Sequence, residues 1–198
     1  MRKLILGCSI AALLFVGCNG ARKPNETNFK KAINAYMAKH GRECVVISHP
    51  LPFDVATDQK GIDPGPAALE QVGLLHSSEI TVPSSFGPAV PARHYVITEL
   101  GKKYLGETQN SVLVGNRTNF CYAQVAVHAI HGWTEPATSA DITYSAVKYT
   151  YQLDNLAPWA KAPVIQTAFP FLKNEIEQAE TKERQLGVIL SSSGWSVE

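Results

Sequence analysis

The sequence predicts an α+β fold in which most strands are antiparallel, and three patterns support this class. Apolar side chains recur at i, i+3, i+4, i+7 and i+8 over residues 29–37, which is the spacing of an amphipathic helix. Apolar and polar side chains alternate over residues 120–133 and again over residues 142–153, as in half-buried strands joined by a hairpin. Two further strand-like segments flank a loop at residues 84–91, whose prolines and glycine exclude regular structure.

The chain begins with the pattern of an export sequence. Arg2 and Lys3 precede an apolar stretch of about 13 residues, shorter than the roughly 17 to 25 residues of a membrane-spanning helix. We therefore predict a signal peptide over residues 1–17. Residues 18–26 are mainly polar and lack periodicity, so we expect them to form a tether that reaches no further than about 26 Å.

The end of this segment, Leu14-Phe15-Val16-Gly17-Cys18, resembles a bacterial lipobox, although Phe15 stands where lipoboxes prefer leucine. The resemblance implies lipidation of Cys18, and two or three acyl chains at about 0.8 kcal/mol per buried methylene hold a protein durably on a membrane. Asn19 replaces the aspartate that retains lipoproteins in the inner membrane, which favours the outer membrane, facing the periplasm. The alternative is an ordinary signal peptide cut after Gly20, with secretion to the periplasm.

Residues 27–106 are predicted to form a helical lobe. The helix over residues 29–37 is stopped by Gly41, and a proline-broken edge strand follows over residues 43–55. Pro66 suits the first position of a second helix. A hairpin over residues 74–100 comes next.

Thr98 is expected to cap a short helix at Glu99–Leu105. The order of helix, hairpin and short helix over residues 66–106 resembles winged-helix domains. The run Tyr-x-x-Thr-x-x-Gly-x-x-Tyr that begins at Tyr95 carries this resemblance. It implies a winged-helix-like lobe packed on an antiparallel β-meander over residues 107–198, within a single domain.

DNA binding does not follow from that resemblance. Removal of Arg2 and Lys3 from the 18 basic residues leaves 16 against 17 acidic residues, so the mature chain carries about one negative charge. Nucleic-acid binders normally show a basic stripe. The helix that would contact bases offers only Glu70 and Gln71 as polar groups. We expect no nucleic-acid partner, and a cytoplasmic winged-helix DNA-binding regulator is kept only as an alternative.

The alternation in the meander predicts two faces. The core face is expected to carry Cys121, Val125, Val127, Ala129 and Trp133 from the first strand, and Val147, Tyr149, Tyr151 and Leu153 from the second. The opposite face would carry a possible recognition surface of aromatic and polar side chains, namely Tyr122, Gln124, His128, Tyr144, Lys148 and Gln152. The alternative is an ordinary solvated sheet face.

Two cysteines remain in the folded part after Cys8 leaves with the signal peptide and Cys18 is acylated. Cys44 and Cys121 lie in apolar, strand-like segments, and the exported compartment is oxidising. We predict a disulfide between them that ties the N-terminal lobe to the meander. Two separate buried thiols are the alternative.

No pattern predicts catalysis, a cofactor or a metal site. His128 and His131 are the only neighbouring histidines, and a spacing of three sends them to opposite faces of a strand. Neither a nucleophile elbow nor a phosphate-binding loop is present. The chain is therefore expected not to be an enzyme, although a periplasmic hydrolase assembled from distant residues remains an alternative.

The lipobox and the pattern "FCY…WTEP…VKYTYQL…WA…AFP" together resemble uncharacterised Gram-negative envelope lipoproteins. The resemblance implies no activity. It implies a membrane-anchored, non-enzymatic binding or scaffolding module of the envelope, whose partner is an envelope protein or glycan.

Overall fold

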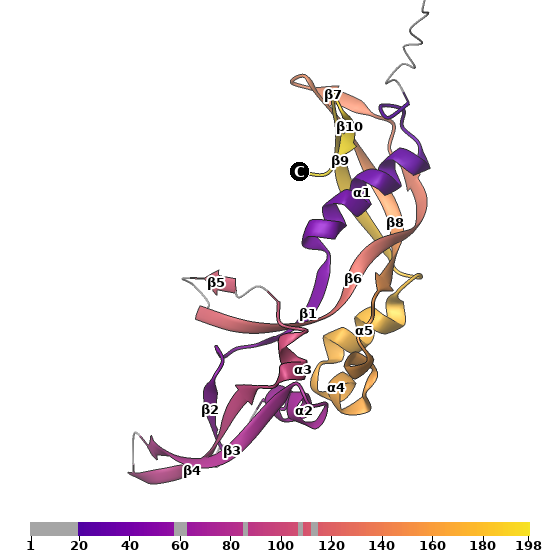
Figure 1. The fold of residues 1–198 in the computed structure, drawn as a ribbon. Coiled ribbons are helices and arrows are strands. Elements are labelled where there is room, and N and C mark those ends of the chain that lie inside the picture. Colours follow the sequence, from indigo (N-terminus) through magenta and orange to yellow (C-terminus); the bar gives the residue numbers. More distant parts are fainter. Residues whose placement is uncertain (1–19, 58–62, 85–86, 107–108, 112–114) are drawn as a thin grey trace, which may run out of the picture.

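The computed structural model of the protein describes residues 20–57, 63–84, 87–106, 109–111 and 115–198. Helices and antiparallel strands both occur in this part of the chain, which confirms the α+β class (Figure 1). The predicted signal peptide and the predicted acylation site, Cys18, lie outside the described residues.

The larger of two antiparallel sheets has seven strands in the described residues. In spatial order its strands are β1 (Arg42–Ile47), β6 (Gly115–Trp133), β8 (Ile142–Asp154), β9 (Glu183–Ser191) and β10 (Gly194–Ser196), with β5 (Gln109–Ser111) beside β6 and β7 (Ala137–Ser139) beside β8. The two alternating segments of the sequence form the central strands β6 and β8, as predicted. The predicted edge strand is β1, which pairs with β6.

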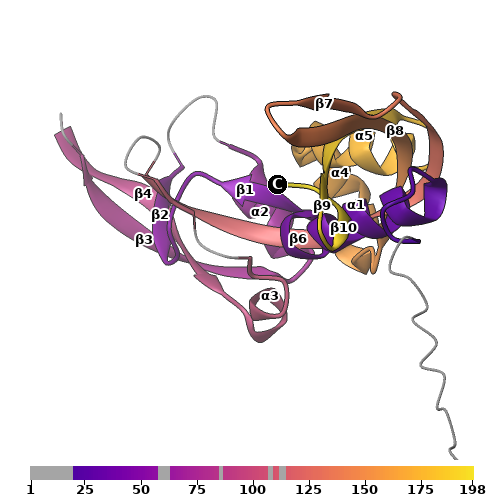
Figure 2. The same cartoon turned by 90° about the horizontal axis from the view of Figure 1, so that it is seen from above.

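A small antiparallel sheet lies at the opposite end of the molecule from β7 and β10 (Figures 1 and 2). Its strands, in spatial order, are β2 (Phe53–Ala56), β4 (Gly87–Ile97) and β3 (Leu75–Ser84). Its hairpin of β3 and β4 is flanked in sequence by α2 (Gly65–Gln71) and α3 (Glu99–Lys102). Thr98 caps α3 as predicted, because its hydroxyl accepts a hydrogen bond from the Gly101 amide at 2.9 Å. This helix ends before Leu105, which instead forms an isolated bridge to Phe120.

The remaining helices are α1 (Glu26–His40), the 3-10 helix η1 (Pro158–Lys161), α4 (Pro163–Ala168) and α5 (Pro170–Gln178). A proline opens each of the last three, where its missing amide costs no intrahelical bond. The first helix was expected in the N-terminal lobe, but its apolar stripe packs on β6, β8 and β10 of the large sheet. The strand β1 belongs to the same sheet, so the predicted lobe of residues 27–106 is divided between two sheets.

Three β-bulges interrupt the alternation along β6. Tyr122 has no partner residue in the pairing of β6 with β1. His128 and His131 have none in the pairing of β6 with β8. A bulge adds one unpaired residue and bends the strand, and β6 is visibly curved in Figure 1. The prediction of two uninterrupted faces was therefore wrong at these positions.

Two hydrophobic cores lie along β6. The α1 core contains the buried residues Phe29, Ala32, Ile33, Met37, Val125, Val127, Val147, Tyr149, Tyr151, Val188 and Trp195. The α2–α5 core contains Val45, Ile47, Phe53, Ala68, Leu69, Leu74, Leu75, Tyr95, Phe120, Tyr122, Ala123, Ala157, Trp159, Ala160, Ile165 and Leu172. Leu153 packs against both cores, and β6 supplies residues to each.

Candidate functional site

The structure does not bring the six residues of the predicted recognition surface together. Tyr122 is buried in the α2–α5 core, because this face of the sheet is covered by Trp159 of η1 and by Leu172 of α5. The amide of Gln124 donates to the Met37 carbonyl at the end of α1. His128 is exposed at its own bulge, where its carbonyl oxygen accepts a hydrogen bond from the Lys30 ammonium at 2.9 Å.

The other three predicted surface residues lie along β8. Tyr144 and Lys148 are exposed and Gln152 is half-buried, and their spacing places them on the face opposite to Tyr149. Gly187, paired with Ala146 between them, would meet no atom within 4 Å if it carried a Cβ. This part of the sheet face is therefore open.

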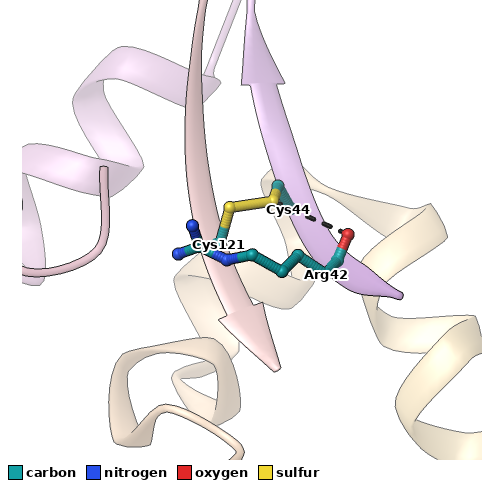
Figure 3. The surroundings of a disulfide bond; sticks show 3 residues. All are labelled: Arg42, Cys44 and Cys121. Carbon is teal, nitrogen blue, oxygen red and sulfur yellow. Dashed lines mark hydrogen bonds between the residues drawn. A yellow bond between two sulfur atoms is a disulfide. The ribbon is translucent and has the colours of Figure 1, made fainter. Parts of the chain in front are cut away.

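Cys44 and Cys121 form a disulfide, as predicted (Figure 3). The two cysteines are directly paired across β1 and β6, so the bond fastens the edge strand to its neighbour within one sheet. The carbonyl oxygen of Arg42 lies 3.8 Å from Cys44 Sγ, a contact without a proton because both sulfurs are bonded. Gly106 is packed so closely on the bond that an added Cβ would lie 2.6 Å from Cys121 Sγ.

Tyr122, beside this disulfide, carries an unsatisfied hydroxyl. Its carbonyl oxygen accepts a hydrogen bond from the Ala157 amide at 2.7 Å, and its ring packs edge-on against Trp159. Within the described chain its buried hydroxyl has no hydrogen-bond partner. Burial raises the pKa of this phenol well above its ordinary value, so the group stays protonated as a donor.

A buried ionic cluster holds α5 against the large sheet. Glu175 is only 3% exposed and accepts a hydrogen bond from the Tyr151 hydroxyl at 2.7 Å. Its carboxylate pairs with the Arg184 guanidinium, and Lys182 Nζ lies 3.6 Å away. The guanidinium also stacks 3.7 Å from the centre of the Tyr151 ring and lies 3.7 Å from Glu43.

The protonation states within the cluster follow from burial and charge. Burial raises the pKa of Glu43, and the neighbouring Arg184 opposes this shift. Burial would lower the pKa of Arg184, but the attractions of Glu175, Tyr151 and Glu43 together outweigh it, so the pKa is raised and the guanidinium keeps its charge. Burial, together with the hydrogen bond to Glu175, raises the pKa of Tyr151 to about 12. The cluster thus joins α5 to β1, β8 and β9 through a charged cation and a neutral phenol.

An apolar groove of about 290 Å³ lies where the turn between α4 and α5 meets the edge strand β1. Its walls include Val46, Tyr122, Phe169 and Phe171. Phe171 is 68% exposed, the largest exposure among the large apolar side chains of the described chain. In that part of the chain β1 pairs only with β6, so its other edge is open beside the groove. The disulfide and the ionic cluster hold the two walls of the groove in place.

A second arrangement of chemical interest lies on the small sheet. Asp54, His94 and Ser78 occupy directly paired positions on β2, β4 and β3, so their side chains share one face. The Nδ1 atom of His94 lies 2.6 Å from the Asp54 carboxylate. Ser78 is exposed on the other side of His94, with no hydrogen bond joining these two described side chains. Sequence reasoning missed this row, because it depends on the register of three strands.

The opposite face of this sheet is tied to α2. Glu70 accepts hydrogen bonds from the amide and the hydroxyl of Ser77, and pairs with Arg93 at 3.0 Å. Burial would raise the pKa of Glu70, but the Ser77 hydrogen bonds and the charge of Arg93 together lower it. The carboxylate therefore fixes the hairpin on α2.

Metal sites and membrane-spanning helices were also considered for the described residues. Within the described ranges, no three His, Cys, Asp or Glu side chains are grouped in a way that suits a metal ion. No helix in those ranges is both long enough and apolar enough to cross a bilayer. No protein-family model matches the chain, and neither the curated proteins nor the solved structures include one that matches it.

Proposed function

We propose that this chain is a lipid-anchored protein of the bacterial envelope that binds an extended segment of a partner protein along the edge of β1. The lipobox-like sequence at Cys18 supports the anchor, at the outer membrane and facing the periplasm, with secretion to the periplasm as the alternative. The observation that carries the binding function is the open edge of β1 beside an apolar groove. No catalytic step is part of this proposal.

The physical basis is strand addition. An open edge strand offers backbone donors and acceptors to an extended chain, and an adjacent pocket selects one of its alternate side chains. Val46 and Phe171 are both exposed at the groove, so an apolar side chain of the partner would bury them. The covalent tie at Cys44 keeps the edge rigid, which reduces the ordering cost of binding.

The segment from α2 to α3 has a supporting role in this proposal. Its elements run in the order helix, strand, strand and helix, and α2 packs against α4. We regard it as a packing unit, since topology alone does not confer DNA binding.

The test is site-specific photocrosslinking in intact cells. A photoreactive phenylalanine analogue at Phe171 or Val46 is expected to give a discrete adduct with an envelope protein, while the same analogue at exposed Lys39 on α1 gives none. Phe171→Asp is expected to abolish the adduct formed from Val46. Equal yields at Phe171 and Lys39 would contradict the proposed site.

A hydrolase is the second candidate, favoured by the row of Asp54, His94 and Ser78. The carboxylate of Asp54 orients the His94 imidazole as in hydrolytic triads. The hydrogen bond between the serine and the histidine of such a site is often long before substrate binds. Labelling of the protein with a fluorophosphonate is expected at Ser78 and is lost in His94→Ala. Labelling that persists in Ser78→Ala would remove this candidate. It would also be removed if the control Ser192→Ala were labelled no more than Ser78→Ala.

A further inference from the structure

The described chain begins as a docked turn and not as a free tether. The Asn28 amide donates to the carbonyl oxygens of Gly20 and Lys23 at 2.7 and 2.9 Å. The Trp195 indole donates to the Arg22 carbonyl at 3.2 Å. Residue 18 is only two positions before Gly20, so an acylated Cys18 would hold this end of the body within about 7 Å of the lipid.

The same end of the molecule exposes large apolar side chains. Seven such side chains are exposed in the described chain. Val46 and Phe171 belong to the groove, and Leu100 and Leu105 lie in and just after α3. The remaining three are Trp133, Ile142 and Tyr144, at the strand ends that flank β7. Figure 1 shows the chain start, β7 and β10 together at this end, far from the small sheet.

We propose that Trp133, Ile142 and Tyr144, which come from both faces of this end of the sheet, form a membrane-facing tip that rests end-on in the interface of the bilayer. Trp133 lies on the α1 face, where it is paired with Val147 and packs against Phe29, whereas Tyr144 lies on the opposite face. The inference rests on the proposed anchor at Cys18 and adds an orientation to it. Tryptophan and tyrosine favour the boundary between headgroups and acyl chains, because each has a large apolar ring and one polar group.

The charge at this end argues for apolar contact and against electrostatic recognition of lipid. Arg22 and Lys23 are exposed there, but so are Glu135 and Asp141 in the connections to β7. Mixed charge of this kind gives little attraction to anionic headgroups. Contact at the tip would direct the small sheet away from the membrane, with the groove between the two ends.

Tryptophan fluorescence isolates this contact. Trp133 is 37% exposed, whereas Trp159 and Trp195 are only 6% and 8% exposed. The full chain, purified with its lipid and placed in phosphatidylcholine vesicles with brominated acyl chains, is expected to lose the Trp133 share of its emission. Trp195 also lies at this end, bound to the Arg22 carbonyl, so the Trp133 share is the part of the quenching that Trp133→Phe removes. Ile142→Ser/Tyr144→Ser weakens quenching of Trp133, while the control Leu100→Ser, near the other end, leaves it unchanged.

The outcomes separate the tip from the anchor. An acylated chain that shows no quenching, or quenching equally strong in Ile142→Ser/Tyr144→Ser, overturns the tip and leaves the anchor standing. Quenching that occurs only when anionic lipid is added overturns the apolar contact. A chain that mass spectrometry finds without acyl groups overturns both the anchor and the tip.

Discussion

The two cores along β6 are built in different ways. The α1 core consists of one amphipathic helix packed on the large sheet, and its buried members are apolar or aromatic. The α2–α5 core gathers short elements, of which η1, α4 and α5 each begin with proline, and is bordered by a disulfide and a buried carboxylate. Apolar periodicity along the sequence predicts the helix and the two central strands that build the first core. The second depends on covalent and ionic ties, and it is the one beside the open edge of β1.

Loss of the disulfide is expected to have the largest effect and to act on the α2–α5 core first. Cys44→Ser/Cys121→Ser opens a sequence separation of 77 residues, which lowers the free energy of unfolding by about 4 to 5 kcal/mol on the chain-entropy model. Chemical denaturation measures the loss, and amide exchange should show β1 opening before α1. A loss below about 1 kcal/mol, or earlier opening of α1, would contradict this ranking.

Disruption of the buried ion pair is expected to rank second. Arg184→Leu leaves the buried carboxylate of Glu175 with Lys182 as its ion-pair partner and the Tyr151 hydroxyl as a donor, so the free energy of unfolding should fall by about 3 kcal/mol. The matched control is Lys173→Leu, which breaks the exposed pair with Glu177 and should cost no more than about 0.5 kcal/mol. Equal losses in the two variants would show that the cluster does not hold α5.

Two matched substitutions, each of which would create a small cavity, compare the two cores directly. Ile33 in the α1 core and Ile165 in the α2–α5 core are both fully buried. Replacement of either by valine is expected to cost about 1 kcal/mol. Because β6 runs through both cores, fluorescence and circular dichroism should report one coincident unfolding transition in each variant. Two separate transitions would mean that the cores fold independently.

The smallest effect concerns the attachment of the hairpin, and it depends on pH. The pKa of Glu70 is lowered from 4.5, so this carboxylate contributes stability above pH 4.5 that is lost as the pH falls through the lowered pKa. Glu70→Gln should therefore be less stable than the parent protein at neutral pH, by about 1 kcal/mol, and the difference should vanish in strong acid. Thermal unfolding across this range is the measurement, and a constant difference at every pH would contradict it.

The comparison also explains what the sequence could predict. The helix α1, the strands β6 and β8 and the cap at Thr98 follow from periodicity and side-chain chemistry, which are local properties. The pairing of Cys44 with Cys121 was predicted by elimination, on the expectation that the chain is exported to an oxidising compartment.

The remaining features depend on pairing between distant segments. Tyr122 was expected on an exposed face, but the helices η1, α4 and α5 cover this part of the sheet, and alternation along one strand cannot predict that cover. Glu175 lies in a polar run of the sequence, and only the tertiary packing buries it against Tyr151. The groove and the row of Asp54 and His94 cannot be predicted from the sequence either, because each depends on how strands and helices are arranged in space.

The proposed acylation of Cys18 underlies both the proposed envelope function and the proposed membrane-facing tip, and intact-mass spectrometry of the protein extracted from membranes tests it most directly. The expected result is a chain that begins at Cys18 and carries two or three acyl chains, absent from Cys18→Ala. A chain that still begins at Met1, or one that is processed without any lipid, would contradict it.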